Sequence, residues 1–161
     1  INRILLWEPN ARIVLHGVSM GAATVLMASG EDLPGNVKAV IADCGYTSEW
    51  DEFQRAADTL HIPWFPVLNA TSVLSKVRDG YDFKQASALA QVKKSRIPTL
   101  FIHGSSDELV PYSMLGELYA AAACEKEELT VEGAGHALSS SVAPTLYWRT
   151  VEDFIAKYLD R

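Results

Sequence analysis

Cysteine is scarce in this sequence, and no metal-binding or disulfide motif is present. The 161 residues include two cysteines, Cys44 and Cys124, and neither lies in a Cys-x-x-Cys or other metal-ligand spacing. Both have apolar or small neighbours, so we predict buried free thiols. No two histidines have the His-Glu-x-x-His spacing of metal hydrolases. The sequence therefore predicts no zinc site, no disulfide framework and no cofactor.

Positive charge and long apolar runs are also lacking. The chain has 14 Lys and Arg against 20 Asp and Glu, a formal net charge of −6. Without a basic patch to neutralise phosphates, nucleic acid is not an expected partner. No apolar stretch has the length of a membrane helix, and there is no signal-peptide pattern. Because the first residue is Ile1 rather than methionine, we expect an upstream part of the same protein, and the cellular location stays open.

Short apolar runs of strand length alternate with helical patterns along the chain. The expected strands are 12–16, 37–42, 98–103 and 128–132. The expected helices are 2–7, 19–29, 48–60, a short one from Asn69 or Thr71 to Val77, 82–92, 112–123 and 144–159. This alternation predicts the α/β class, with a parallel sheet, right-handed crossovers and helices on both faces. Residues 1–161 are expected to form a single domain.

The segment 48–93 is longer than one crossover helix requires. We interpret it as a helical insert, with Ser48 as the N-cap of its first helix. Its aromatic residues either line a substrate pocket or pack the insert onto the domain; they are Trp50, Phe53, Trp64, Phe65 and Tyr81. The stretch 63–66 has two prolines around two aromatic residues, so it is expected to break the helices and form a stiff, lid-like loop.

The stretch 12–28 is predicted to form a buried strand, a sharp turn and a helix. The turn, Gly17-Val18-Ser19-Met20-Gly21, matches Gly-x-Ser-x-Gly. A serine in a strained strand-to-helix turn needs flanking residues without side chains, because neighbouring backbone passes close by. The turn places the Ser19 hydroxyl at a helix N-terminus, where amide N–H groups favour developing negative charge.

Two other strands end in residues that can activate a serine. Asp107 follows the third strand, and His136 follows the fourth. The carboxyl ends of parallel strands share one edge of the sheet, so we expect Ser19, Asp107 and His136 to lie together there. A serine hydroxyl needs a base such as imidazole, and the imidazole needs a carboxylate that fixes its tautomer.

Two other carboxylates are candidates for the acidic role. Glu108 is adjacent to Asp107, but the spacing from His103-Gly104 favours Asp107. Asp43 also ends a strand, and a structural hydrogen-bonding role is preferred for it over that of a reserve acid.

The remaining histidines are expected to have other roles. His103 precedes the glycine turn before Asp107 and is predicted to pack or hydrogen-bond. His16 lies just before the serine turn, where it would face the surroundings of the sheet. His61 falls in the insert and is expected to be exposed.

The chain resembles the C-terminal portion of a serine hydrolase with the α/β-hydrolase fold. More narrowly, it is similar to bacterial exported or membrane-anchored hydrolases that carry Gly-Val-Ser-Met-Gly-Ala-Ala-Thr. The resemblance rests on residues 17–21, 43–51, 103–111 and 133–136. It implies Ser19 as nucleophile, Asp107 as acid and His136 as base, with the Met20 backbone N–H as one oxyanion donor. The order of the three residues is that of this fold.

The resemblance also implies a reaction, namely cleavage of carboxylic esters of small acyl substrates through an acyl-enzyme. Peptides, amides and thioesters remain alternatives, as does a non-catalytic binding protein on the same scaffold. Complete members have further sheet strands before the serine turn and a second oxyanion donor there. Loss of one donor costs about 3 kcal/mol. The segment alone is therefore expected to be a poor and less stable catalyst.

Overall fold

Four parallel strands form one sheet in the order β1-β2-β3-β4. The computed structural model describes residues 1–159, apart from the side chain of Asp79. The strands are β1 (Ile13–Val18), β2 (Val37–Asp43), β3 (Thr99–Gly104) and β4 (Lys126–Val131). β2 and β3 are almost fully buried apolar runs, as expected of central parallel strands. The predicted parallel sheet is confirmed.

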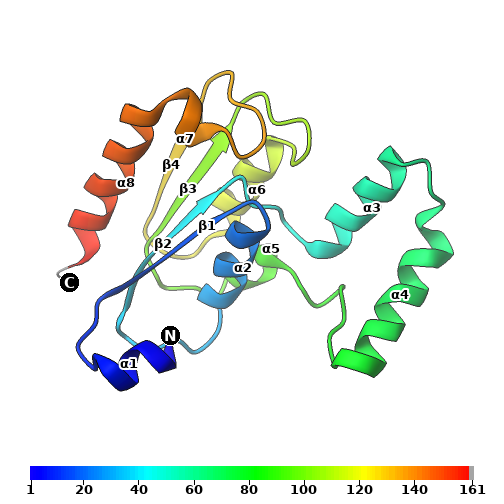
Figure 1. Ribbon diagram of the computed structural model, residues 1–161, viewed down its shortest axis with the longest axis horizontal. Coiled ribbons are helices and arrows are strands. Elements are labelled where there is room, and N and C mark those ends of the chain that lie inside the picture. Colours follow the sequence, from blue (N-terminus) through cyan, green and yellow to red (C-terminus); the bar gives the residue numbers. More distant parts are fainter. Residues whose placement is uncertain (160–161) are drawn as a thin grey trace.

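Helices cover both faces of the sheet, as predicted (Figure 1). One layer contains α2 (Met20–Ser29), α5 (Ala88–Val92) and α6 (Ser113–Ala121). Its core includes Leu26, Phe101 and Leu118. The other face is covered by α8 (Pro144–Leu159), whose buried Tyr147 and Phe154 pack on Ile41 and its neighbours. Two short helices complete the fold, α1 (Asn2–Trp7) and α7 (Ser139–Val142), and α7 packs against α8 and β3.

The insert differs from its prediction around the prolines. Its two main helices are α3 (Glu49–Thr59) and α4 (Trp64–Asp79). Pro63 is the N-cap of α4, and only Phe65 has non-helical backbone angles. Proline is accepted in a first helical turn because the amides there have no intrahelical acceptor. The predicted break is therefore present as a kink at Phe65, but no separate lid-like loop forms, because α4 includes residues on both sides of the kink.

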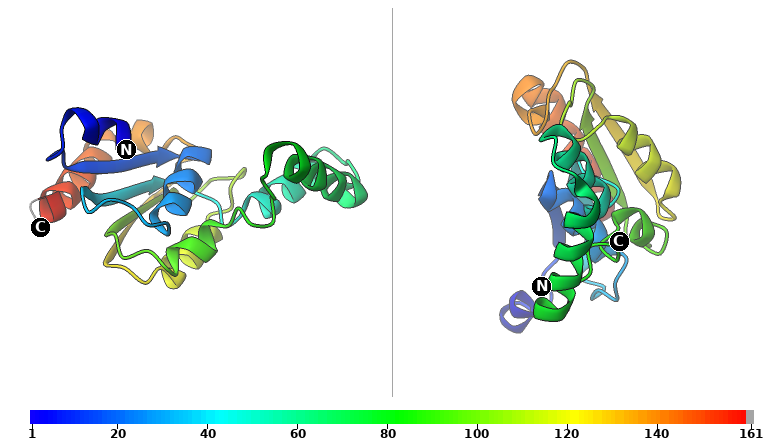
Figure 2. Two further views of the ribbon diagram at one scale, coloured as in Figure 1. Left: turned by 90° about the horizontal axis from the view of Figure 1, so that it is seen from below. Right: turned by 90° about the vertical axis from the view of Figure 1, so that its right-hand side faces the viewer.

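α3 and α4 form an arm that projects from one side of the sheet and its helices (Figures 1 and 2). The two ends of the arm meet at a neck. There Ser48 and Ser87 form an isolated antiparallel bridge, and the Glu49 amide donates to the Ala86 carbonyl over 3.0 Å. α5 lies within the predicted insert 48–93 but packs against α2 and α6. The projecting part is thus the segment between the two neck serines.

The arm has its own aromatic contacts and cavities. Phe53 packs on Phe83 with ring centroids 4.9 Å apart, which joins α3 to the segment after α4. A mainly apolar cavity of about 290 Å³ lies between α3 and α4. A second cavity, of about 580 Å³, is lined by Trp50, Trp64 and Phe65. These aromatic residues therefore pack within the arm and line its cavities. The two predicted roles, lining a substrate pocket and packing the insert onto the domain, stay predictions.

No helix within residues 1–159 combines the length and apolar character needed to span a bilayer.

Candidate active site

Ser19 stands at a strained turn between β1 and α2. Its backbone has φ 55° and ψ −118°, and it is the N-cap of α2. The Ser19 amide donates a 2.8 Å hydrogen bond to the Asp43 carbonyl at the end of β2. A Cβ on Gly17 would collide with the backbone of Gly21, so the first glycine permits the close approach that was predicted. A Cβ on Gly21 would meet no atom within 4 Å, and the same argument fails for the second glycine.

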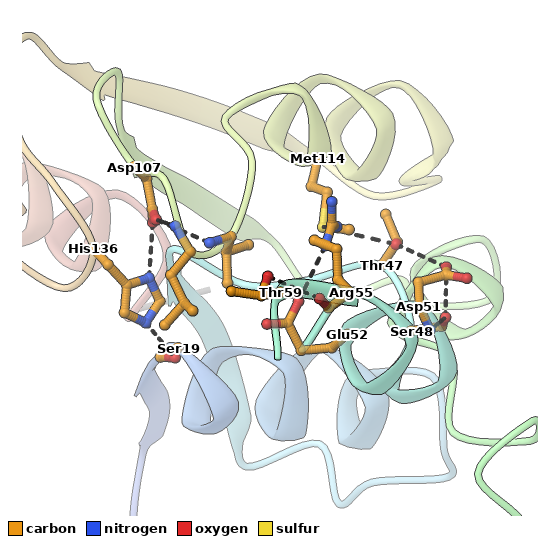
Figure 3. Close-up of polar contacts among 12 residues, drawn as sticks. Ser19, Thr47, Ser48, Asp51, Glu52, Arg55, Thr59, Asp107, Met114 and His136 are labelled. Atoms are coloured by element: carbon orange, nitrogen blue, oxygen red, sulfur yellow. Dashed lines mark hydrogen bonds and ion pairs between the residues drawn. The ribbon is translucent and has the colours of Figure 1, made fainter. Parts of the chain in front are cut away.

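A continuous chain of hydrogen bonds joins the three predicted residues (Figure 3). The Ser19 Oγ lies 2.7 Å from His136 Nε2, and His136 Nδ1 lies 2.8 Å from Asp107 Oδ2. A neutral imidazole with its proton on Nδ1 satisfies both contacts, because Nδ1 donates to the carboxylate and Nε2 accepts from the hydroxyl. This tautomer is the one that a general base for serine requires.

Asp107 is fixed by its own loop. Its Oδ1 accepts hydrogen bonds from the amides of Leu109 and Val110, at 3.0 and 2.9 Å. His103 Nε2 donates to the Val110 carbonyl over 3.0 Å and lies 3.3 Å from Asp107 Oδ2. The buried His103 therefore has the hydrogen-bonding role that was predicted. Glu108, the alternative acid, is exposed.

The loop that carries His136 is held against β3 and β2. A Cβ on Gly104 would collide with the Ala134 carbonyl, so only glycine allows this loop to lie so close to β3. Beyond the histidine, Ala137 has φ 57°. The hydroxyl of the fully buried Ser139 donates to Asp43 Oδ1 over 3.0 Å. Asp43 thus contacts both the serine turn and the histidine loop.

The buried Asp43 and Tyr147 belong to a polar network below the site that ends at the exposed His16. Tyr147 hydrogen-bonds Asp43 and lies 3.0 Å from His16 Nε2. Burial raises the pKa of the Asp43 carboxyl, and the hydrogen bonds from Ser139 and Tyr147 oppose this shift. Burial also lowers the pKa of His16, which favours its neutral form. The structural role preferred for Asp43 agrees with these contacts.

The structure keeps two other predicted residues outside this chain of contacts. His61 is exposed just beyond the far end of α3, as expected. Met20 is the first residue of α2, so its amide has no intrahelical acceptor and lies at the positive end of the helix dipole. That amide directly follows Ser19, at the position where α/β-hydrolases have an oxyanion donor.

Glu52 and Arg55 on α3 were not identified from the sequence. Arg55 Nε lies 3.8 Å from Glu52 Oε2, and its guanidinium reaches Met114 Sδ (Figure 3). Burial raises the pKa of Glu52, although the neighbouring Arg55 and His136 favour its ionised form. The arm thus brings a carboxylate within electrostatic range of His136. No sequence spacing predicts this interaction between Glu52 and His136, since it depends on the direction in which the arm leaves the sheet.

Comparison with known proteins identifies the family. Residues 7–161 match the prolyl oligopeptidase family, peptidase family S9. The chain belongs to this family. It is 31% identical over 144 residues to the uncharacterised protein YqkD of Bacillus subtilis. This match covers 89% of the chain and 47% of YqkD. It is also 31% identical over 155 residues to the α/β-hydrolase domain-containing protein WAV2 of Arabidopsis thaliana, covering 92% and 48%.

Solved structures of other hydrolases share the fold. The esterase Pf2001 of Pyrococcus furiosus superposes with a TM-score of 0.72 at 22% identity, covering 98% of this chain and 59% of the esterase. The acylaminoacyl peptidase of Pyrococcus horikoshii gives 0.68 at 18% identity, covering 99% and 26%. The family and the fold together support a serine hydrolase of the α/β-hydrolase type.

The chain spans about half the length of the curated relatives that it matches. The names of YqkD, WAV2 and the two Pyrococcus enzymes say nothing of export or a membrane anchor. The narrower resemblance to exported or membrane-anchored hydrolases therefore finds no support in them.

Proposed function

We propose that this chain carries the catalytic centre of a serine hydrolase that cleaves carboxylic esters through an acyl-enzyme. The observation that carries the proposal is the hydrogen-bonded series from Ser19 through His136 to Asp107, with contacts of 2.7 and 2.8 Å. The carboxylate accepts two further backbone N–H bonds, which keep it oriented toward the imidazole. The proposal concerns the whole protein, of which this chain is the part described.

Acylation begins when Ser19 Oγ attacks the ester carbonyl carbon and its proton passes to His136 Nε2. The imidazolium that forms is stabilised by Asp107. The carbonyl oxygen becomes an oxyanion, which the Met20 amide at the N-terminus of α2 is placed to bind. The imidazolium then gives its proton to the leaving alkoxide, and the acyl group stays on Ser19.

Deacylation repeats these proton transfers with water. His136 removes a proton from the water that attacks the acyl carbonyl, and returns it to Ser19 Oγ when the acid leaves. The polar contacts of His103 and Ser139 hold the two loops through both steps. One imidazole and one carboxylate therefore complete the cycle without a cofactor in this proposal.

Labelling with a fluorophosphonate tests the nucleophile. The probe should modify the full-length protein once and should not modify its Ser19→Ala variant. Ser75→Ala, on α4 in the arm, is the matched serine control and should label as the unmodified sequence does. Equal labelling of wild type and Ser19→Ala would overturn the proposal.

A panel of p-nitrophenyl esters of increasing acyl length tests the substrate class, beside matched thioesters and peptide amides. Ester hydrolysis that exceeds amide hydrolysis, and that is lost in Ser19→Ala, supports the proposal. Faster cleavage of the amides would assign the site to a peptidase. Ligand binding without turnover would favour a binding protein.

A further inference from the structure

A thiol lies beside the catalytic residues. Cys44 Sγ, a carboxylate oxygen of Asp107 and a ring nitrogen of His136 lie within 4.8 Å of one another. The three residues follow β2, β3 and β4, so the sheet edge that gathers the catalytic groups also gathers the cysteine. Their separations in the chain, 63 and 29 residues, match no short metal-binding motif, and for this reason the sequence did not reveal the cluster.

The sulfur of Cys44 is buried among strained backbone. Cys44 is 1% exposed and has φ 47°. The backbone groups of Ser19 and Ala137 lie beside its sulfur, and these residues also have positive φ angles, 55° and 57°. Three strained residues from separate loops therefore meet at one thiol. Strain of this kind persists only where the surrounding structure enforces it, and it gathers at functional sites.

We propose that Cys44, Asp107 and His136 form a binding site for a soft divalent cation, Zn²⁺ or Cd²⁺, and that the bound cation blocks hydrolysis. Sulfur, imidazole nitrogen and carboxylate oxygen are together a zinc donor set, and three protein ligands leave the fourth position open. His136 is the member of the set with solvent exposure, 20% of its side chain. The cation therefore enters past the imidazole, from the side of Ser19.

The geometry requires a small adjustment. Zinc bonds of about 2.0–2.3 Å place neighbouring ligand atoms roughly 3.3–3.6 Å apart in a tetrahedral site. His136 Nδ1 and Asp107 Oδ2 are 2.8 Å apart, so they separate slightly when the metal binds. The Cys44 sulfur lies at most 4.8 Å from the other two ligand atoms, and it moves toward them. The Cys44 thiol gives up its proton to water as the metal–sulfur bond forms. The imidazole stays neutral, and Asp107 stays ionised.

Binding at either ring nitrogen removes the base. A neutral imidazole has one lone pair and one proton. If the metal binds Nε2, the lone pair that accepts the Ser19 proton is occupied. If it binds Nδ1, the proton resides on Nε2, which then donates rather than accepts. This inhibitory consequence rests on the proposed function, whereas the cation binding itself does not.

The binding test uses full-length protein with Ser19→Ala, so that it is independent of turnover. Titration calorimetry with zinc chloride should show one site, and cadmium should give a thiolate-to-metal charge-transfer absorption in the ultraviolet. Adding Cys44→Ser should abolish the absorption and weaken zinc binding more than about tenfold. Even the loss of a residue that only hydrogen-bonds a metal ligand lowers metal affinity by about 10–100-fold. Cys124→Ser, at the other, half-buried cysteine, is the matched control and should change neither signal.

A second variant keeps the test decisive if Cys44→Ser fails to fold. His136→Gln retains the thiol but removes the partly exposed imidazole, and it should weaken zinc binding by a similar factor. Unchanged zinc affinity in either folded variant would overturn the proposed site.

The inhibition test uses active full-length protein. Zinc should stop ester turnover, and a chelator should restore it. Absence of any ester turnover would contradict the proposed function alone, because the titrations in Ser19→Ala would still decide the cation site. Turnover that zinc leaves unchanged, in protein shown to bind it, would overturn the inhibitory role.

Discussion

Asp43 accepts a 3.0 Å hydrogen bond from the hydroxyl of Ser139, although 96 residues separate the two in the chain. Both side chains are fully buried. Ser139 lies three residues after His136, and the Asp43 carbonyl holds the Ser19 amide. This one contact therefore couples the loop of His136 to the turn of Ser19.

Removing the Ser139 hydroxyl should loosen that coupling. Ser139→Ala leaves a buried acceptor on Asp43 with one donor fewer, which should cost about 1–3 kcal/mol of unfolding free energy. If His136 shifts, kcat for ester hydrolysis should fall roughly tenfold or more while KM stays unchanged. Urea denaturation and steady-state kinetics measure the two effects. The exposed Ser141→Ala, in the same short helix, should match the wild type. Unchanged kcat in Ser139→Ala would contradict a positioning role.

The raised pKa of Asp43 predicts a specific pH dependence of stability. Between the unfolded value near 3.8 and the higher folded value, the native state binds more protons than the unfolded state. The ionised carboxyl therefore carries a folding cost that is absent at acid pH and grows as the pH rises through this window. Asp43→Asn lacks this titration. Denaturant unfolding measured at several pH values compares the two proteins. The unfolding free energy of the wild type, relative to that of Asp43→Asn, should fall as the pH rises from 3.8, and parallel plots of unfolding free energy against pH would refute this prediction.

Gly17→Ala should destabilise the serine turn. The added methyl group would meet the Gly21 carbonyl, so we expect a loss of about 1–3 kcal/mol, as for other overpacked sites. The matched control is Gly116→Ala on α6, where a Cβ meets no atom within 4 Å. That change should stabilise the helix by about 0.5–1 kcal/mol. Thermal unfolding of both variants checks the contrast, and equal shifts would argue against it.

Glu52 should favour substrates that carry a positive charge. Its carboxyl oxygen Oε2 is buried and forms no hydrogen bond, and it interacts electrostatically with Arg55, whose Nε lies 3.8 Å away, and with His136. Glu52→Gln should lower kcat/KM several-fold for an ester with an ammonium group on its alcohol. A neutral ester of the same shape should be nearly unaffected. Gln54→Glu, on the same helix, controls for a general change of charge. A uniform loss on both esters would point to misplacement of α3 instead.

The sheet, and the meeting of Ser19, Asp107 and His136 at one edge of it, could be predicted because each depends on local sequence. β2 and β3 are short apolar runs that are buried on both faces, and a polar residue marks the end of each strand. Parallel order then places the residues that follow the strands at one edge. The same rule placed Asp43 there, and its neighbour Cys44 follows directly.

The predicted starts of β4 and α4 were wrong, because β4 begins with polar residues and α4 begins beside prolines. β4 begins at Lys126, two residues before its predicted start, because Lys126 and Glu127 pair with β3 through backbone bonds. Lys126 is held there by its ammonium group, which donates to the carbonyls of Tyr119 and Ala122. α4 begins at Trp64, directly after its N-cap Pro63, rather than at Asn69 or Thr71 as predicted. These differences arise from tertiary contacts and from the distinct rules of the first helical turn.

The contacts of Ser139 and Glu52 depend on the paths of long connections through space. Ser139 reaches Asp43 only because the loop after β4 turns back across β2. Glu52 approaches His136 only because the arm leaves the sheet beside α6, where Arg55 meets Met114. No periodicity or motif encodes such paths, so sequence reasoning found the chemical groups but not their neighbours.

The neck between Ser48 and Ser87 also bears on how the protein can change. Since the two ends of the arm are already paired, lengthening or shortening the segment between them alters loop-closure entropy only slowly, by about 0.6 kcal/mol for each doubling. Ser19, Asp107 and His136 follow β1, β3 and β4, and none of these residues belongs to the arm. A change in the length of the arm therefore leaves the chain path through these three residues intact.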